Sequence, residues 1–210
     1  MNDIKKLREM TGAGLADCKK ALAESEDMDG AVAYLRKKGQ AVAAKRSDRE
    51  ASEGCVLVKA ENGFGAIIAL KCETDFVANN ADFVALTQEI LDAAVANKCK
   101  TLDEVKALPM GSGNVQDAVT ERSGITGEKM ELDGYCVIEG ENIATYNHMN
   151  RNSLCTMLAL SKSVEDATVG KNIAMQIASA APVAIDESGV PQSEKDNEVA
   201  VAIKKTKAEQ

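Results

Sequence analysis

The spacing of the hydrophobic residues changes near residue 54, and this change limits what the chain can fold into. Before it, apolar side chains recur three or four positions apart, as in Ile4 and Leu7 and again in Leu15, Cys18 and Leu22. Beyond it, they form short runs and alternating patterns typical of strands, which are followed by helical patterns. Helices at the N-terminus followed by strands and helices predict an α+β protein.

The first forty residues have the pattern of three short helices. The third helix begins near Asp29 and is expected to stop at Gly39, because glycine commonly follows the last residue of a helix. Helices this short do not persist alone in water, so they must pack on one another. We therefore expect a miniature three-helix bundle over residues 1–40 and a charged linker over residues 41–53.

Residues 54–128 predict the first half of a core. Strand-like runs at 55–60 and 64–71 flank Asn62-Gly63, a residue pair that favours a tight hairpin turn. A long amphipathic helix is expected to follow the second strand.

Two more helices are expected before residue 128. The first starts with a capping box formed by Thr101 and Glu104, in which each side chain satisfies a backbone N–H of the other residue. The second is capped by Asn114 and is expected to end at Gly124.

The second half of the core, residues 129–190, repeats the order of strands followed by a helix. Its strands are expected at 130–138, 143–147 and 153–161, and its helix is expected to place Val169, Ile173 and Ile177 on one face. The two halves together predict a two-part core of antiparallel sheets backed by helices.

The last segment, residues 191–210, is compatible with a charged helix. Only Val199 and Ile203 form an apolar stripe, and a helix with such a narrow stripe commonly projects or packs on something beyond itself. We expect this segment to be the start of a helical hairpin and the chain to be a fragment that is truncated at its C-terminus.

Composition disfavours several classes of function. Aromatic residues make up 3% of the chain and the net charge is −8, whereas nucleic-acid binding is favoured by aromatic platforms and clustered basic residues. No apolar run is long enough to cross a bilayer, and residues 1–6 lack the apolar region of a secretory signal. We therefore expect a cytoplasmic protein that binds neither nucleic acid nor membrane.

The candidate catalytic residue types are sparse. The six cysteines lie 17 residues or more apart, and His148 is the single histidine, so no metal-ligand set is expected. Reduced, buried thiols are the favoured interpretation. Without a phosphate-binding loop, a catalytic triad or a metal set, we expect a protein without a cofactor that is not an enzyme; a thiol-based enzyme, the weakest alternative, would need a cysteine of low pKa.

Three stretches resemble one known family. Leu7–Leu22 reads LREMTGAGLADCKKAL, Cys72–Ala78 reads CETDFVA, and Val169–Pro182 contains the weaker match IAMQ. Together they are similar to the bacterial elongation factor Ts family in residues, order and separation. The resemblance implies an N-terminal module like a ubiquitin-associated domain, a two-part α+β core and a helical hairpin.

The resemblance also implies a function and a set of contact residues. Members of the family are guanine-nucleotide exchange factors for elongation factor Tu, which they bind in its GDP-bound and nucleotide-free states, and a homodimer through the core is a further possibility. The expected site is the turn Thr74, Asp75, Phe76 and Val77, with the Asp75-Phe76 pair inserted beside the nucleotide and Mg²⁺ of the partner. Further expected contacts are Leu15, Ala16 and His148, although the sequence after His148 lacks the glycines of the family pattern.

Taken without the family, these residues have plainer interpretations. Thr74 or Asp75 can cap a helix while Phe76 fills the core beneath it. The alternative function is an interaction module whose N-terminal bundle binds a peptide or a ubiquitin-like partner. The two functions differ in Phe76, which an exchange factor must expose at a tip and which a scaffold would bury.

Overall fold

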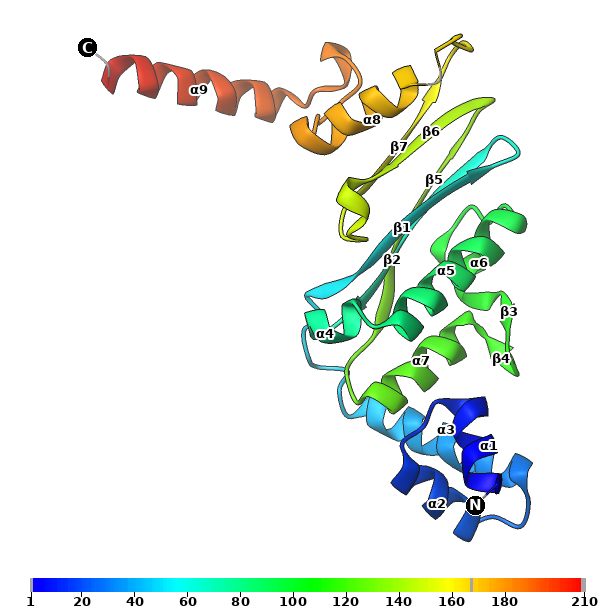
Figure 1. Cartoon of the computed structure of the whole chain (residues 1–210). Helices are drawn as coiled ribbons and strands as arrows, with labels where there is room; N and C mark the ends of the chain where they lie inside the picture. The colour runs from blue at the N-terminus through cyan, green and yellow to red at the C-terminus, as the bar shows by residue number, and fades with distance from the viewer. Residues whose placement is uncertain (1, 167, 209–210) are drawn as a thin grey trace.

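The computed structural model describes residues 2–166 and 168–208 (Figure 1). The helices are α1 (Asn2–Thr11), α2 (Leu15–Ala23), α3 (Met28–Ala44), α4 (Asp75–Ala78), α5 (Ala81–Ala96), α6 (Leu102–Ala107), α7 (Val115–Thr126), α8 (Thr168–Ala180) and α9 (Gln192–Ala208), with short 3-10 turns η1 (His148–Asn150) and η2 (Glu187–Gly189). The strands are β1 (Glu53–Glu61), β2 (Phe64–Cys72), β3 (Pro109–Met110), β4 (Gly113–Asn114), β5 (Glu131–Glu139), β6 (Asn142–Asn147) and β7 (Cys155–Leu160). This order confirms the predicted α+β class.

The three N-terminal helices enclose a very small core. Its fully buried members are small apart from Leu7, and Ile4, Leu22 and Leu35 pack against them from the sides. The buried set is Leu7, Ala13, Cys18, Ala21 and Ala31. So little buried apolar area gives the bundle little stability of its own, and its packing against the rest of the protein is therefore important.

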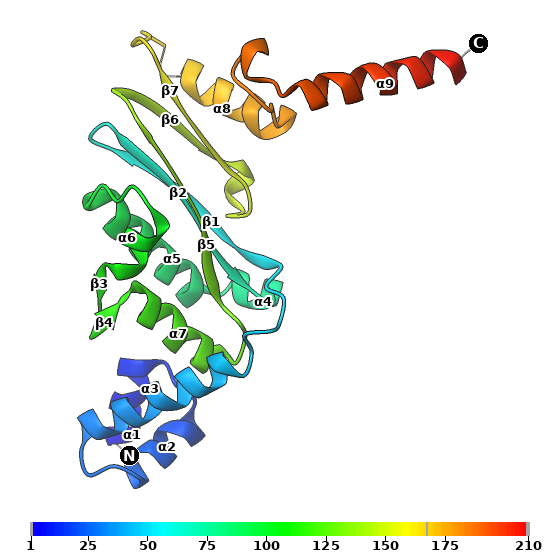
Figure 2. The ribbon, with the colours of Figure 1, turned by 180° about the vertical axis from the view of Figure 1, so that it is seen from behind.

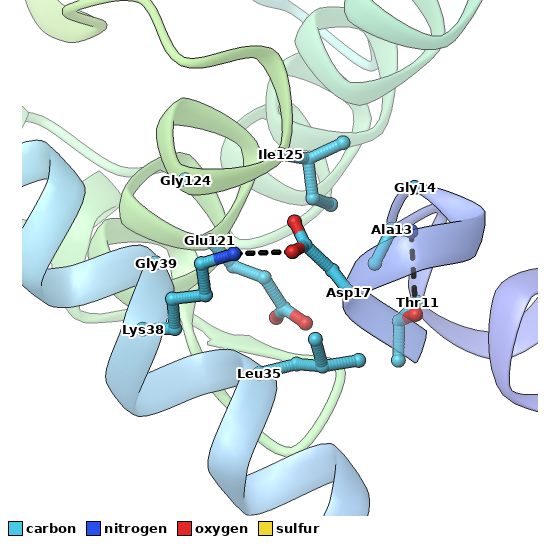
Figure 3. Close-up of a pocket in the computed structure, with 10 residues that line it drawn as sticks. All are labelled: Thr11, Ala13, Gly14, Asp17, Leu35, Lys38, Gly39, Glu121, Gly124 and Ile125. Atoms are coloured by element: carbon cyan, nitrogen blue, oxygen red, sulfur yellow. Dashed lines mark hydrogen bonds and ion pairs between the residues drawn. The ribbon is translucent and has the colours of Figure 1, made fainter. Parts of the chain in front are cut away.

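That packing explains why the predicted end of the third helix was wrong. Helix α3 does not stop at Gly39 but continues to Ala44, and α7 likewise runs past Gly124 and ends at Gly127, whose φ of 72° is the left-handed terminating conformation. Gly39 and Gly124 face each other where the two helices cross (Figure 3). The missing side chains let the helix backbones approach closely, so both glycines serve packing rather than termination.

A side-chain contact supports the same junction. Lys38 of α3 forms an ion pair with Asp17 of α2 beside the crossing, and Leu35, Glu121 and Ile125 line the small pocket there (Figure 3). Because both ionic side chains are partly exposed, we attribute little stability to the pair. The close backbone contact is the stronger constraint on how the N-terminal module sits against α7.

The main sheet has the order β1-β2-β5 and is antiparallel throughout. Strands β1 and β2 are joined by the predicted turn, in which Asn62 and Gly63 have φ values of 50° and 75° and Glu61 pairs with Phe64. Both central residues have the positive φ that such a hairpin requires, which confirms this turn. The strand predicted in the second half, β5, pairs with β2 and so joins the sheet of the first half.

Helix α5 covers one face of this sheet and closes the main core (Figure 1). Phe83, Ile90 and Leu91 of α5 are fully buried together with Ile68 and Leu70 of β2. The predicted caps of the next two helices are confirmed, because Thr101 with Glu104 and Asn114 with Asp117 both form complete capping boxes.

A second sheet consists of β6 and β7, with α8 packed against it. The apolar face predicted for α8 is only partly covered: Val169 and Ile177 are half-buried and Ile173 is exposed, while the buried residues are Gly170 and Ala174. A Cβ atom on Gly170 would lie 2.6 Å from the Cβ of Ala144 on β6, so only a residue without a side chain fits. Because α8 approaches the sheet closely, its small residues face the sheet and its larger apolar residues are less buried.

Helix α9 projects away from the other elements and buries none of its described residues (Figures 1 and 2). No helix within residues 2–166 and 168–208 has the length and apolar character that crossing a membrane requires. The division into units at 1–40, 41–53, 54–128, 129–190 and 191–210 stays a prediction.

The crossing of α3 and α7 leads to a first prediction. Gly124→Ala would place a Cβ 2.1 Å from the Cα of Gly39, backbone against backbone, and should destabilise the fold by about 2 kcal/mol or more despite the better helix propensity of alanine. Chemical unfolding followed by circular dichroism measures this, which suits a chain without tryptophan.

The matched control lies on the other side of the same contact. A Cβ on Gly39 would meet the Cα of Gly124 at 3.4 Å, which is ordinary van der Waals contact. Gly39→Ala should therefore leave the free energy of unfolding within about 1 kcal/mol of the wild type or raise it. Equal losses in the two variants would contradict the crossing geometry.

Candidate functional site: an exposed phenylalanine on a fixed turn

The predicted site Thr74–Val77 forms one tight turn immediately after β2. Thr74 has extended backbone angles and caps α4, because its side-chain oxygen accepts a hydrogen bond from the backbone N–H of Val77 at 3.4 Å. At the other end, the Asn79 side chain donates to the carbonyl of Asp75 at 2.8 Å. Local hydrogen bonds thus hold a helix of only four residues, which would not form alone.

The side chains of this turn point to opposite environments. Ala78 is buried and Val77 packs against the main core, whereas Asp75 is exposed and Phe76 exposes 85% of its surface. The plainer interpretation was therefore right about Thr74 as a cap and wrong about Phe76 as a core residue. A phenylalanine leaves this much apolar surface in water at a cost in free energy, and such exposure is a common mark of a binding surface.

Glu73, the residue before the turn, is held by three hydrogen bonds. Its carboxylate accepts from the backbone N–H of Lys129 at 2.6 Å, from Arg49 at 2.9 Å and from Arg46 at 3.3 Å. The hydrogen bond from Lys129 and the two guanidinium groups lower the pKa of Glu73 to about 2. Glu73 therefore stays ionised, and it connects the start of the turn to the segment after α3 and to the segment after α7.

The next predicted contact residues, Leu15 and Ala16, lie at the start of α2. Leu15 exposes 62% of its surface and Ala16 is exposed as well, although the helical pattern had grouped Leu15 with the buried Cys18. Leu15 thus lies off the core face of α2. Met10, near the end of α1, is also exposed, which adds apolar surface to the N-terminal module.

His148 lies at the tip of the β6–β7 hairpin, in η1. Its ring is exposed, and Nδ1 lies 3.1 Å from the hydroxyl of Tyr146. The positions after it have positive φ: 53° at Met149, 54° at Asn150 and 56° at Asn152. The loop thus keeps left-handed conformations that glycine adopts most easily, with asparagine, which tolerates them well, at two of the three.

These three groups of residues come from different elements. Helix α4, the tip that carries η1, and α2 lie along the same edge of the ribbon (Figures 1 and 2). The hairpin tip is tied to the main sheet near the turn, because the N–H of Val56 donates to the carbonyl of Asn152 at 2.6 Å. The turn, the hairpin tip and the N-terminal module therefore provide separate surfaces at one edge.

The cysteines offer little reactivity. Four of the six are buried, Cys155 is half-buried and Cys136 is exposed, so the prediction of buried thiols was wrong for Cys136. Burial raises the pKa of Cys72 to about 11 and that of Cys155 to about 12, which disfavours their nucleophilic thiolates. Across residues 2–166 and 168–208, no three His, Cys, Asp or Glu side chains gather in a way that would hold a metal ion.

Sequence reasoning missed the charged residues that surround the turn. Arg46 and Arg49 had been assigned to a linker, and Glu128 to the boundary between two halves of the core, yet Glu128 accepts a hydrogen bond from the hydroxyl of Thr74 at 2.6 Å. The charge density of the linker was visible, but its partners lie 24 to 27 residues further along the chain. No local pattern connects residues that far apart.

Comparison with known proteins identifies the family. A family model described as "Elongation factor TS" matches residues 73–210, a range that begins next to the turn. The chain belongs to the elongation factor Ts family. Elongation factor Ts of Parabacteroides distasonis and that of Bacteroides fragilis are each 69% identical to it over its whole length, and the protein of Porphyromonas gingivalis is 50% identical over 98% of the chain.

The coverage of these relatives differs. The chain spans 64% of the length of the Parabacteroides distasonis and Bacteroides fragilis proteins and 75% of the Porphyromonas gingivalis protein. The activity and partners of complete elongation factor Ts proteins are therefore treated below as a proposal for this chain.

Because Phe76 lies outside the core of this member of the elongation factor Ts family, it should not support the fold. We expect Phe76→Ala to change the free energy of unfolding by no more than about 0.5 kcal/mol. Phe83→Ala, which empties a fully buried position, should cost about 3–5 kcal/mol. Thermal or urea unfolding of both variants tests this contrast, and a large loss in Phe76→Ala would contradict the exposed placement.

The low pKa of Glu73 predicts a pH dependence of stability. The folded pKa of about 2 lies below the ordinary value of 4.5, so the contribution of Glu73 is complete above about pH 4.5 and is lost as the pH falls toward 2. The wild type should exceed Glu73→Gln in stability by about 1–2 kcal/mol at pH 7, a figure discounted because Arg49 is largely exposed. Unfolding curves at several pH values should show this difference shrink below pH 4.5; a constant difference would count against the assignment.

Proposed function

We propose that this chain accelerates the release of GDP from elongation factor Tu and so allows GTP to bind in its place. The observation that carries the proposal is the exposure of Phe76 on a fixed turn in a member of the elongation factor Ts family. The turn Thr74–Val77 is the proposed contact with the nucleotide site of the partner.

The proposed mechanism displaces the groups that hold the nucleotide. In GTP-binding proteins, backbone amides and a lysine surround the phosphates, while Mg²⁺ neutralises their charge. Insertion of Asp75 and Phe76 beside this site would move the groups that position the partner's Mg²⁺, and GDP would then lose that compensation. No covalent step is required, so the chain acts through binding alone and is not an enzyme in the chemical sense.

The energies involved are sufficient. Burying one phenylalanine side chain contributes about 1.5–3 kcal/mol, and each 1.4 kcal/mol corresponds to about tenfold in affinity. Contacts elsewhere in the interface add to what this side chain contributes. Because such coupling is reciprocal, GDP must weaken the binding of this chain by the same factor by which the chain weakens GDP.

Other exposed residues support a larger interface. We propose Leu15 and Ala16 on α2 and His148 at the hairpin tip as further contacts with elongation factor Tu, in its GDP-bound and nucleotide-free forms. The elements that carry these residues, α2 and the tip of the β6–β7 hairpin, lie along the same edge of the ribbon as α4 (Figure 1). A homodimer through the core and a cytoplasmic location also belong to this proposal.

One observation favours the second candidate, an interaction module. Met10 and Leu15 leave apolar surface exposed on the N-terminal bundle, as a peptide-binding or ubiquitin-binding module would. The exposed Phe76 has no role in such a module, which makes the exchange factor the better supported function.

The proposal is tested by the release of a fluorescent GDP analogue from elongation factor Tu. The chain should accelerate release strongly, and Phe76→Ala should reduce the rate by about tenfold to a hundredfold, in line with the loss of one buried phenylalanine. Ile185→Ala, which truncates a fully exposed apolar residue outside the proposed contacts, is the matched control and should release GDP like the wild type.

Binding measured on the same samples completes the test. Excess GDP should weaken the complex by the factor by which the chain weakens GDP. Binding without acceleration by the folded wild-type chain would reject the exchange function and favour the interaction module. Acceleration that survives in Phe76→Ala would keep the function and reject the turn as its site.

A further inference from the structure

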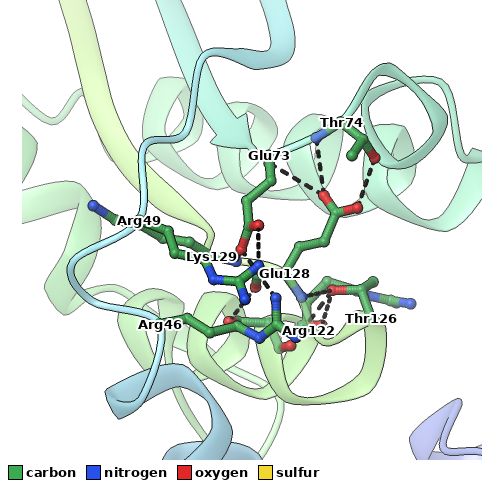
Figure 4. Close-up of polar contacts among 9 residues, drawn as sticks. Arg46, Arg49, Glu73, Thr74, Arg122, Thr126, Glu128 and Lys129 are labelled. Atoms are coloured by element: carbon green, nitrogen blue, oxygen red, sulfur yellow. Dashed lines mark hydrogen bonds and ion pairs between the residues drawn. The ribbon is translucent and has the colours of Figure 1, made fainter.

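A reciprocal pair of glutamates joins the segment that leads into the turn to the segment that follows α7. The Glu128 carboxylate accepts from the backbone N–H groups of Glu73 and Thr74, both at 3.1 Å, and from the Thr74 hydroxyl at 2.6 Å (Figure 4). In return, the Glu73 carboxylate accepts from the N–H of Lys129 at 2.6 Å. We call this arrangement the glutamate clasp, consisting of Glu73, Thr74, Glu128 and Lys129.

Glu128 is itself well fixed. It follows Gly127, the left-handed residue that ends α7, and its carbonyl accepts a hydrogen bond from the Ser123 hydroxyl at 2.5 Å. Its backbone N–H donates to the Thr126 hydroxyl at 3.3 Å (Figure 4). The carboxylate that holds the turn therefore stands on the end of a packed helix rather than on a free loop.

The clasp supplies order that the turn cannot obtain from packing. Only Val77 and Ala78 contact the core, whereas Asp75 and Phe76 are exposed. An exposed turn would lose conformational entropy when it binds, and that loss weakens binding unless the turn is ordered beforehand. The hydrogen bonds that the Glu128 carboxylate accepts from the consecutive backbone N–H groups of Glu73 and Thr74 restrict the backbone shortly before Phe76.

We propose that Glu128 is a positioning residue, whose carboxylate sets the Thr74–Val77 turn in the conformation that presents Phe76 to the partner. This inference rests on the proposed exchange function, in which Phe76 enters the partner. Glu128 acts through Thr74 and does not itself touch the partner's nucleotide. It lies 54 residues from the turn in sequence, and no motif connects the two.

The decisive measurement separates binding from displacement. Rates of GDP-analogue release are measured over a range of chain concentrations, which yields a maximal rate and a half-saturating concentration. In Glu128→Gln the maximal rate should fall by roughly tenfold, as expected for the loss of charge-assisted hydrogen bonds. The half-saturating concentration should change less than threefold, because the surfaces at Leu15 and His148 are untouched.

Variants of Thr74 test the same contact from the other side. Thr74→Ser retains the hydroxyl and should lose less of the maximal rate than Thr74→Val, which removes both the donor to Glu128 and the cap of α4. The double variant Glu128→Gln with Thr74→Val should lose less than the two single losses combined, since both substitutions remove the hydrogen bond between Thr74 and Glu128. Additive losses would overturn the proposal.

A matched control removes the negative charge of another glutamate, one that is held by an ion pair. Glu139, at the other end of β5, pairs with Lys100, and Glu139→Gln should keep the maximal rate of the wild type. Amide hydrogen exchange of Val77 and Ala78 gives a readout that needs no partner. Exchange there should accelerate in Glu128→Gln while that of the core helix α5 stays unchanged, which separates a mobile turn from a destabilised fold.

The outcomes distinguish the two proposals. If the wild type does not accelerate GDP release, the proposed nucleotide-exchange function fails, whatever amide hydrogen exchange shows for the turn. If both the wild type and Glu128→Gln accelerate release to the same maximal rate, the function stands and the positioning role is overturned. Equal slowing in Glu128→Gln and Glu139→Gln would also overturn it, since a general effect of charge would then explain the loss.

Discussion

The close crossing of α3 and α7 at Gly39 and Gly124 is the contact on which the arrangement of the site depends. It holds an N-terminal bundle that has almost no core of its own against the rest of the protein. Both helices continue beyond these glycines, α3 to Ala44 and α7 to Thr126. Because α3 continues past Gly39, Arg46 and Arg49 come within hydrogen-bond distance of Glu73. Because α7 continues past Gly124, Glu128 reaches the turn.

The turn combines a rigid base with an exposed tip. Below it, β2 and α5 form a well-packed core, and Ala78 belongs to that core. At its side, the Glu128 carboxylate accepts hydrogen bonds from the backbone N–H groups of Glu73 and Thr74, the two residues that lead into α4. What remains without packing within this turn is the surface of Asp75 and Phe76. The apolar surface of Phe76 is not buried in the free protein, so the free energy of burying it can contribute to binding.

Much of the fold was predictable from the sequence, because the signals were local. The Asn62-Gly63 turn, the capping boxes at Thr101 and Asn114, and the helical and strand periodicities each depend on residues within a few positions of one another. The errors have a common physical cause. Gly39, Gly124 and Gly170 each lack a side chain because another backbone or side chain lies too close, and sequence alone does not show what will approach them.

The site was predictable in part for the same reason. The turn itself follows from a motif of consecutive residues, and Thr74 as its cap follows from local hydrogen bonding. The exposure of Phe76 did not follow, since a phenylalanine beside a cap fills a core equally well in many proteins. The role of Glu128 could not be predicted, because its carboxylate lies 54 residues along the chain from Thr74, which it holds.

A turn that displaces groups of a partner's binding site must be more rigid than that site. In the proposed function, binding free energy gained at Leu15 or His148 can weaken the binding of GDP only if the structure between these residues and Phe76 does not deform. From α2, that connection runs through the α3–α7 crossing, where a Cβ on Gly124 would lie 2.1 Å from a Cα of the other helix, and then through Glu128 to Thr74. Close-packed interiors transmit strain because they compress little, and short charged hydrogen bonds restrict direction as well as distance. The same contacts that fix the small N-terminal bundle therefore give Phe76 the firm support that displacement of a bound nucleotide requires.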